Sequence, residues 1–364
     1  MENTAFLKRY ENKVTKVLRE NSFIVEEKDR ELIKTRIENG RRYFYIVLPR
    51  LENGQKVERF LKIPCRNTKK LLEPFYRQLL IAEYLQKNQT ILTRGVVDSR
   101  IDHKTGTPFA IMDTFSVSHS KIGFIDGFAK AEELTKIHTK NVIHALDKMH
   151  AVKISDLPTA LQRILKKYKD DYKSVRRDFG KFLNKKVKTL DGTGEELFHK
   201  VLERRLQISN FRRKAIDLLE LLHPIIFSDE NLSGALVHGD MAPNNLYVYD
   251  NGDVELLDLE WVGYCNNKVM AMVIDYGNLR GRSWNNDVFR NALDEYILQL
   301  YEKMGNKLLG QAIVSLAILR THLMLAGFFE NYAHEKQSDA EQKLRREKTE
   351  NDLKKAWSVM GKTL

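Results

Sequence analysis

Residues Val237 to Leu246 read VHGDMAPNNL, and residues Leu256 to Trp261 read LLDLEW. These two stretches decide the fold and the chemistry that the chain can support. In the first, Asp240 lies between a short apolar run and a turn-forming Pro-Asn pair, and Asn245 lies five residues after it. The sequence therefore predicts a polar loop that presents an acid and an amide.

A predicted hairpin follows this loop. Residues Leu246 to Tyr249 form an alternating apolar stretch, and the DNGD sequence at 250–253 is typical of a hairpin turn. The segment Val254–Leu257 predicts the returning strand, which ends at Asp258. A loop, a hairpin and a strand end should therefore bring Asp258 close to the acid and the amide of the loop.

Phosphoryl transfer suits this set of side chains. Its transition state is loose, so a protein contributes mainly by positioning groups and neutralising charge. The Asp240 carboxylate can orient an acceptor hydroxyl and take its proton. The side chains of Asn245 and Asp258 offer hard oxygen ligands of the kind that Mg²⁺ prefers. A lone His-Gly-Asp loop is usually structural, whereas the whole set predicts transfer from a magnesium nucleotide to a hydroxyl.

The pattern HGDxxPxN followed by LDxEW resembles the aminoglycoside phosphotransferase and choline kinase group of protein-kinase-like enzymes. The resemblance implies that Asp240 is the catalytic base and that His238 is a structural member of the catalytic loop. It also implies that Asn245 and Asp258 are metal ligands. Glu260 matches an acid that often follows the metal-binding Asp in this family. The implied co-substrate is ATP or GTP, with Mg²⁺ as cofactor.

A second family element lies further along the chain. Ile274-Asp275-Tyr276 resembles the Tyr-Asp-Leu element, whose Asp usually braces the catalytic loop. The segment Cys265–Val273 makes the spacing before it a few residues longer than usual. By resemblance, Asp275 is the residue that braces the catalytic loop.

The amino-terminal half contains a second predicted hairpin. Arg42–Leu48 predicts one strand, Glu52–Gln55 a turn, and Val57–Ile63 a returning strand that ends at Pro64. The small lobe of a kinase needs such a hairpin, because a Lys on its returning strand steadies the nucleotide phosphates. Lys62 is the residue in that position.

In the family, a helix after this Lys supplies a Glu that pairs with it. The segment Leu71–Lys87 has helical periodicity, and its Leu-x-x-Leu pattern aligns Gln78 with the family's Glu. Either Gln78 makes a weaker hydrogen bond to Lys62, or Glu73 or Glu83 takes the role.

A short apolar strand is predicted within residues 106–115. In the family this strand leads into the hinge between lobes, whose backbone groups bind the adenine edge. By resemblance, Met112 would lie behind the base, and Asp113 and Phe115 would offer backbone contacts. Without the other motifs, a plain core strand with Met as a gap filler would be the better interpretation.

The composition fits an intracellular enzyme of about two domains. The chain has 364 residues, 42% of them hydrophobic, and only two cysteines, Cys65 and Cys265, without metal-ligand spacing. A reducing compartment is expected, and we predict a cytoplasmic location. Residues Met1–Glu20 lack the apolar core of a signal peptide. The apolar stretch Ala312–Leu319 is too short to span a bilayer and predicts a buried helix.

The chain is basic, with 61 Lys and Arg against 49 Asp and Glu and a net charge of +12. Much of this charge lies in residues 162–188, where Tyr and Phe are interleaved with the cations. The run is either a solvated helix face or a platform for an anionic surface or substrate. Since aminoglycosides are polycations, such a run would repel them, and a neutral or anionic acceptor is favoured.

Three aromatic residues, Trp261, Tyr264 and Trp284, suggest a different acceptor. Quaternary ammonium groups bind over aromatic faces, and the surrounding sequence loosely resembles choline and ethanolamine kinases. With Glu260, these residues are the candidate acceptor contacts. Three such aromatic side chains more often belong to a hydrophobic core than to an aromatic cage that binds a cation.

The sequence thus predicts an α/β (α+β) protein with a bilobal, protein-kinase-like fold. Residues 1–115 would form a small β-rich nucleotide-binding lobe with a helical lead-in at 1–20. Residues 116–364 would form a larger, mainly helical lobe with the catalytic loop and acceptor site. The predicted activity is small-molecule phosphotransfer. The alternatives are a choline- or ethanolamine-type kinase, a lipid or glycan kinase at a membrane surface, and an RNA- or polyanion-binding pseudokinase.

Overall fold

The structure is a computed structural model that describes residues 2–39, 42–88, 91–100, 106–114, 121–124, 136–188, 194–249, 251–283, 286–333 and 339–363. The chain divides into two compact units. The first consists of residues 1–121, 157–165 and 249–262, and the second of residues 122–156, 166–248 and 263–364. Two short segments that follow residue 121 in the sequence thus belong to the first unit.

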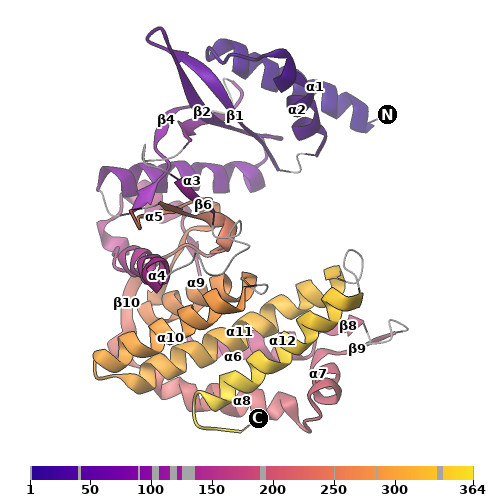
Figure 1. The fold of residues 1–364 in the computed structure, drawn as a ribbon, viewed down its shortest axis with the longest axis vertical. Helices are drawn as coiled ribbons and strands as arrows, with labels where there is room; N and C mark the ends of the chain where they lie inside the picture. The colour runs from indigo at the N-terminus through magenta and orange to yellow at the C-terminus, as the bar shows by residue number, and fades with distance from the viewer. Residues whose placement is uncertain are drawn as a thin grey trace. The chain divides into compact units, whose positions relative to one another are not determined.

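An antiparallel sheet forms the centre of the first unit (Figure 1). In sheet order, its strands are β1 (Tyr43–Glu52), β2 (Gln55–Pro64), β5 (Phe109–Asp113) and β4 (Val96–Arg100). The predicted hairpin is confirmed, and Asn53 and Gly54 both have positive φ, 48° and 80°. An Asn-Gly pair suits this two-residue turn because both residues tolerate that backbone region.

Alternation along the strands gives the sheet two apolar faces. Phe44, Leu61 and Ile63 face one side and pack with helix α1 (Glu2–Glu20). The Tyr10 hydroxyl of that helix donates to the Ile63 carbonyl at 3.1 Å and accepts from the Phe44 amide at 2.7 Å. The predicted helical lead-in is therefore part of the core.

The other face of the sheet carries Tyr43, Ala110 and Met112, which pack against Phe75 and Leu79. These two residues belong to helix α3 (Lys69–Lys87), which is the helix predicted after Lys62. Helix α2 (Glu27–Asn39) was not predicted from the sequence, and it packs beside α1 and β1.

The remaining elements of the first unit come from its two later segments and from the α3–β4 connection. They are α5 (Thr159–Ile164), β3 (Leu92–Thr93), β12 (Val254–Leu256) and the 3₁₀ turn η5 (Leu259–Trp261). Strand β12 pairs in parallel with β3, and η5 packs against α3. The predicted turn before β12 is closed by a hydrogen bond from the Gly252 amide to the Tyr249 carbonyl at 2.9 Å.

The second unit is mainly helical. Its α-helices are α4 (Lys136–His150), α6 (Tyr172–Leu183), α7 (Phe198–Leu206), α8 (Phe211–Ile226), α9 (Lys268–Arg282), α10 (Asp287–Lys303), α11 (Lys307–Ala333) and α12 (Asp339–Ser358). Its strands are β6 (Lys121–Phe124), β7 (Lys166–Lys167), β8 (Lys186–Lys188), β9 (Glu195–Leu197), β10 (Leu232–Val237), β11 (Leu246–Tyr249) and β13 (Gly263–Asn267), and its 3₁₀ turns are η2 (Ile154–Asp156), η3 (Asp229–Asn231) and η4 (Pro243–Asn245).

Helix α11 is the central helix of this unit, and α8, α9, α10 and α12 pack around it (Figure 1). The segment Ala312–Leu319 is completely buried within it, as predicted from its continuous apolar sequence.

The dense charge of the segment Ala340–Lys355 predicts an exposed helix. It is helical, as part of α12, but the exposure was wrong for its last turns. Leu353, Ala356 and Trp357 are buried, and the Trp357 ring lies 5.9 Å from that of Phe211. Among the described residues, no helix is both long and apolar enough to cross a membrane.

Candidate functional site

The predicted catalytic loop begins where β10 ends in the second unit. The Asp275 carboxylate of α9 accepts hydrogen bonds from the backbone amides of His238 and Gly239, each at 2.8 Å. Gly239 has a φ of 79°, a conformation that favours glycine. The brace that the resemblance assigned to Asp275 is therefore present as a contact, in spite of the longer spacing before it.

Two histidines complete this brace. The His150 Nε2 atom lies 3.0 Å from an oxygen of Asp275, so α4 as well as α9 is tied to the loop. The His238 side chain is completely buried, and its Nδ1 accepts a hydrogen bond from the Asp240 amide at 3.4 Å. His238 is the residue to which the resemblance assigns a structural role in this loop.

The rest of the loop is held from both sides. The Asn245 side chain donates to the Asp240 carbonyl at 2.8 Å, and the Asn278 side chain of α9 donates to the Gly239 carbonyl at 3.2 Å. These contacts fix the loop backbone and leave the Asp240 side chain partly exposed, at 23%.

The Asp240 carboxylate has a cationic partner that the sequence analysis missed. The Arg282 Nη2 atom donates to Asp240 Oδ1. Arg282 is the last residue of α9. It follows Asn278 by four residues and Asp275 by seven, so the three side chains lie toward one face of the helix. Helical spacing from Asp275 is the signal that could have identified it.

Lys62 is the centre of the polar contacts in the first unit. Its Nζ atom donates to Gln78 Oε1 at 2.7 Å and to Glu260 Oε1 at 2.6 Å, and it lies 3.6 Å from Asp258 Oδ1. The Lys62 residue is 6% exposed. Of the predicted alternatives for its partner, Gln78 makes the contact, whereas Glu73 pairs with Arg77.

Glu260 is the second partner of Lys62 and lies 198 positions from it. Burial raises the pKa of the Glu260 carboxyl, while the Lys62 ammonium opposes that rise. A guanidinium nitrogen of Arg42 lies 3.3 Å from the other Glu260 oxygen, and Arg77 donates to the Glu260 carbonyl at 2.8 Å. Glu260 was predicted among the acceptor residues, and local sequence patterns gave no signal for Arg42 or Arg77.

The predicted hinge strand is β5. Met112 is buried against α3. The Asp113 amide donates to the Gly95 carbonyl at 2.9 Å, and its carboxylate accepts from Arg59 at 2.6 Å. Burial raises the pKa of the Asp113 carboxyl, and Arg59 opposes that rise. Phe115 lies outside the described residues.

The three aromatic acceptor candidates lie in different surroundings. In the first unit, the Arg42 guanidinium lies over the Trp261 ring at 5.6 Å, so the cation on that ring belongs to the chain itself. In the second unit, Tyr264 lies in β13, and its carbonyl accepts from the Tyr168 amide at 2.9 Å. Trp284 lies outside the described residues.

Among the described residues, no three or more His, Cys, Asp or Glu side chains form a cluster that could hold a metal ion. The predicted ligand pair contains one amide and one carboxylate. Asn245 donates through Nδ2, so its Oδ1 takes no part in that bond. Asp258 has a left-handed backbone conformation, with a φ of 56°, and its side chain is 40% exposed. Both are oxygen donors of the type that suits Mg²⁺.

No protein-family model matches the sequence, and no curated protein matches it at a significant level. Solved structures do match. A candidate aminoglycoside phosphotransferase from Ralstonia eutropha JMP134 is 13% identical, with a TM-score of 0.53, over 93% of this chain and 98% of that chain.

Two further solved structures give similar results. A GDP complex of a mutant aminoglycoside 2′-phosphotransferase-IIIa is 12% identical over 89% of this chain and 91% of that chain, with a TM-score of 0.50. A thermostable mutant of aminoglycoside phosphotransferase APH(4)-Ia, bound to ADP and hygromycin B, is 12% identical over 90% of this chain and 97% of that chain, also with a TM-score of 0.50. The chain therefore has the mixed α/β, protein-kinase-like fold of the aminoglycoside phosphotransferases.

Proposed function

We propose that this chain is a phosphotransferase that moves the γ-phosphoryl group of ATP or GTP to a hydroxyl of a small molecule. The observation that carries the proposal is the brace on the catalytic loop. One carboxylate, from Asp275, binds two successive backbone amides, and the loop so fixed presents the Asp240 carboxylate partly exposed. A loop held in this way suits a base that must orient a hydroxyl, since positioning supplies much of the catalysis of phosphoryl transfer.

Asp240 is the proposed base. Its carboxylate would accept a hydrogen bond from the acceptor hydroxyl and then the proton, as the hydroxyl oxygen forms its bond to the γ-phosphorus. The bond from that phosphorus to the β,γ-bridging oxygen breaks, and the nucleoside diphosphate leaves. His238 and Asp275 act on this step only by holding the loop.

Lys62 is the proposed ligand of the nucleotide phosphates. Its ammonium is held by Gln78 and Glu260, so its position is set before the nucleotide binds. By resemblance, Met112, Asp113 and Phe115 belong to the region that binds the base. The solved complexes with GDP and ADP contain nucleotides of both kinds, and we propose a nucleoside triphosphate as the donor without choosing between the two bases.

Asn245 and Asp258 would hold Mg²⁺ through their side-chain oxygens. When bound, the ion would neutralise charge on the β- and γ-phosphates. This assignment agrees with the donor set, since a carboxylate and an amide oxygen are hard ligands and Mg²⁺ takes its remaining ligands from phosphate and water.

Calorimetric titration of ATP and of GTP, with and without Mg²⁺, tests the proposal. We expect metal-dependent binding that Asp258→Ala weakens at least tenfold. Asp240→Ala should abolish turnover while nucleotide affinity stays within about threefold, a free-energy difference below about 0.7 kcal/mol. Wild-type turnover in both variants would show that the assigned residues are wrong. Absence of binding by either nucleotide would show that the function is wrong.

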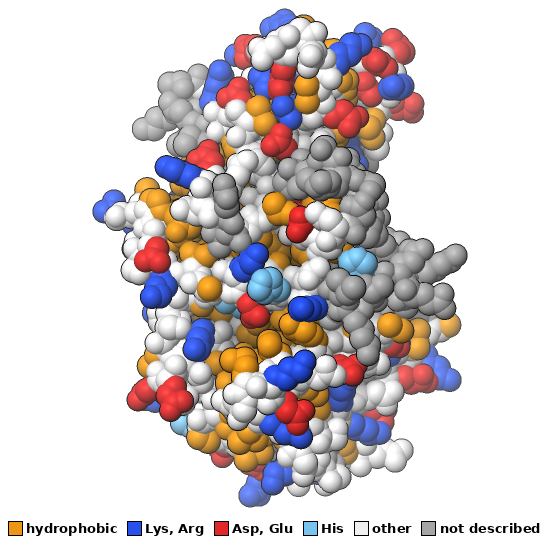
Figure 2. All heavy atoms as spheres, turned by 60° about the vertical axis from the view of Figure 1, so that its left-hand side comes forward, with side chains coloured by type: hydrophobic (Ala, Val, Ile, Leu, Met, Phe, Trp, Pro, Cys, Tyr) orange, Lys and Arg blue, Asp and Glu red, His pale blue; other side chains and the backbone are white. Residues whose placement is uncertain are grey.

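One further observation favours a second candidate function, the binding of RNA. On the face shown in Figure 2, Lys and Arg side chains are interspersed with acidic and apolar ones. In contrast, a groove of about 580 Å³ between α6 and α8 is lined by Lys173, Arg176, Arg177 and Arg212, with Glu220 as its acidic member. These cations include three residues of the basic run 162–188, and a concentration of cations in one groove suits a phosphate backbone.

The groove can be tested separately from the phosphotransferase. Fluorescence anisotropy of a labelled single-stranded RNA should show salt-sensitive binding that Arg177→Glu with Arg212→Glu reduces at least tenfold. Lys181→Glu changes an exposed cation on the same helix outside the groove lining and is the matched control. Equal losses in the two variants would show that the groove is not the binding site. Unchanged RNA affinity in the double variant would rule out the second candidate.

A further inference from the structure

The ion pair between Arg282 and Asp240 is unusual for a catalytic base, because a base must be available to the substrate. Both side chains are partly exposed, Arg282 at 37% and Asp240 at 23%. Among the described residues, Asp240 is the one acid paired with Arg282. The Arg282 guanidinium therefore contacts the carboxylate that we propose as the base, and both side chains are partly exposed.

The position of Arg282 is set by a helix that is fixed along two faces. Toward the loop, Asp275 and Asn278 bind the backbone at His238 and Gly239. Successive residues of a helix are rotated by about 100°, so Arg280, two positions before Arg282, points roughly the opposite way.

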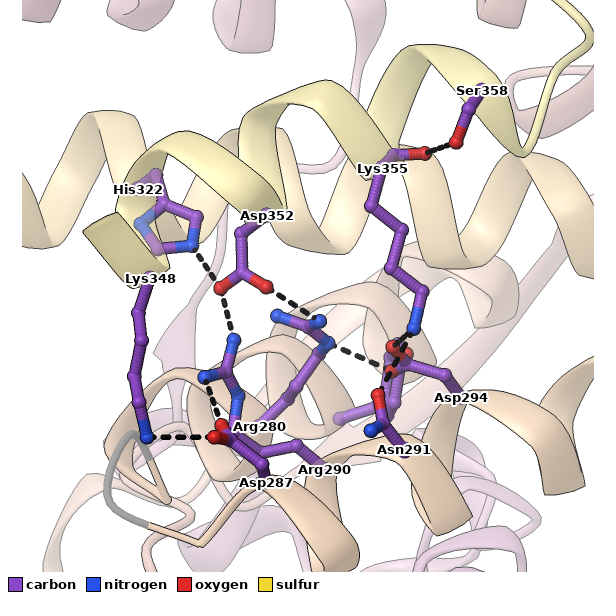
Figure 3. A network of polar contacts seen from close by, with 11 residues as sticks. Arg280, Asp287, Arg290, Asn291, Asp294, His322, Lys348, Asp352, Lys355 and Ser358 are labelled. Atoms are coloured by element: carbon purple, nitrogen blue, oxygen red, sulfur yellow. Dashed lines mark hydrogen bonds and ion pairs between the residues drawn. The ribbon is translucent and has the colours of Figure 1, made fainter. Parts of the chain in front are cut away.

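Arg280 belongs to a buried network that joins four helices (Figure 3). It donates to Asp294 of α10 at 2.7 Å and to Asp352 of α12 at 2.9 Å. Asp352 also accepts from His322 of α11 at 2.7 Å. Arg280 is thus neutralised by two buried acids, whereas its neighbour Arg282 pairs with the proposed base. These contacts tie α9 to α10 and α12, and Arg282 lies at the end of α9.

The Arg282 guanidinium has N–H groups that could bind a ligand. Arg carries five N–H groups in a planar fork, and the contact with Asp240 uses Nη2. An acceptor molecule could therefore place its hydroxyl on Asp240 and an anionic group on the remaining donors of Arg282.

We infer that Arg282 forms an anion-binding subsite beside Asp240, and that the acceptor is a hydroxy compound with a carboxylate or a phosphate ester near the reacting hydroxyl. This inference rests on the proposed function and specifies its substrate class. Arg binds both kinds of anion through parallel hydrogen bonds. The same cation disfavours polycationic acceptors, since like charges in contact lower affinity.

Two matched pairs of acceptors test the inference in the full-length protein. Glycerate and glycerol differ by a carboxylate, and ribose 5-phosphate and ribose differ by a phosphate ester. We expect wild-type kcat/KM, measured by release of nucleoside diphosphate, to be at least tenfold higher for the anionic member of one pair. The pair that shows the preference distinguishes a carboxylate from a phosphate ligand.

Variants then connect the preference with Arg282. Arg282→Gln should lower the anionic-to-neutral ratio of kcat/KM at least tenfold, mainly through KM for the anion, and Arg282→Lys should restore part of it. Lys268→Gln removes an exposed cation at the other end of α9, about 21 Å away by helix geometry, and should keep the ratio. Because the ratio compares two acceptors within one variant, a general loss of activity does not change it.

Three results would overturn the inference. In the first, neutral acceptors are phosphorylated as well as their anionic partners, and the phosphotransferase proposal stands. In the second, Arg282→Gln lowers kcat equally for both members of a pair, which shows that Arg282 only positions Asp240. In the third, no anionic member is phosphorylated although the protein binds a magnesium nucleotide. Failure of nucleotide binding itself would instead remove the proposed function.

Discussion

Arg280 and Asp352 form a buried ion pair, 2.9 Å between Nη2 and Oδ1, that joins the helix bracing the catalytic loop to the last helix of the chain. The two side chains are 3% and 9% exposed. The same Asp352 carboxylate also contacts His322 and Arg290 (Figure 3). One acid of α12 thus holds α9, α10 and α11 in place.

Asp352→Asn should therefore be among the most destabilising single changes in this unit. Removing one member of a buried ion pair leaves its partners charged and uncompensated, which typically costs about 3–5 kcal/mol. Urea unfolding followed by circular dichroism measures the loss. Glu350→Gln, on the same helix, removes a partly exposed carboxylate that pairs with Lys354. This control should change the unfolding free energy by no more than about 0.5 kcal/mol. Equal losses in the two variants would contradict the importance of the network.

The network also predicts a dependence of stability on pH. Burial would raise the pKa of Asp352, but hydrogen bonds and charge from His322 and Arg280 outweigh it and hold the pKa well below its ordinary value. At Asp294, burial would also raise the pKa. The charges and hydrogen bonds of Arg280 and Lys355 outweigh this effect, so the pKa of Asp294 is lowered as well. An acid whose pKa is lower in the folded state than in the unfolded state stabilises the fold at pH values above its unfolded pKa, which is about 3.9 for Asp. This contribution is lost as the pH falls below that value.

Thermal unfolding at a series of pH values measures this effect. The wild-type melting temperature should fall steeply below about pH 4.5, as the unfolded state begins to bind protons at these acids. In Asp352→Asn the fall should be shallower, because one of the titrating groups is gone. Parallel curves for the two proteins would contradict the assignment.

Asp275→Asn tests the brace on the catalytic loop. An amide has one oxygen and one NH₂, so it can accept from only one of the two backbone amides that Asp275 binds, and its NH₂ would face the other donor. We expect a loss of stability of about 1–3 kcal/mol from the unsatisfied donor. Turnover should fall at least tenfold. Nucleotide affinity, in which Asp275 has no proposed part, should change less than threefold.

Asp229→Asn is the control for this variant, because Asp229 is an exposed acid of the same unit. Turnover close to wild type in Asp275→Asn, together with reduced stability, would show that the brace serves the fold and not the base.

Local patterns predicted much of the fold and of the loop. The hairpin around Asn53 and Gly54, the polar loop at Asp240 and the buried segment of α11 each have a signature within a few neighbouring residues. Helix α2 was missed because it has few apolar residues and buries Ile37 alone among those whose burial is described. Its packing comes from tertiary contacts that local periodicity does not record.

Ion pairs between residues far apart in the sequence could not be predicted from local patterns. Lys62 and Glu260 are 198 positions apart, and Arg280 and Asp352 are 72 apart. Nothing in the sequence near Asp352 marks it as buried, because the surrounding segment is densely charged. Only the packing of α12 shows that its carboxylate contacts side chains from three other helices.

The last prediction concerns the carboxylate that pairs with Lys62. In the family that the sequence resembles, the helix after this Lys supplies a Glu for this purpose. Here that position is Gln78, and Glu260 contacts the same ammonium from a distant segment. If Glu260 has taken over the role, Gln78→Glu should be harmful. It would place two carboxylates on one ammonium in a buried site, and each would raise the pKa of the other.

We expect Gln78→Glu to lower stability by about 1–3 kcal/mol and to weaken nucleotide binding. Glu260→Gln should also weaken binding, because Lys62 loses its charged partner. The double variant, Gln78→Glu with Glu260→Gln, restores one carboxylate on Lys62 from the other side and should recover most of the nucleotide affinity measured by calorimetry. An additive loss in the double variant would show that the two positions act independently, and that Glu260 does not replace the family's Glu.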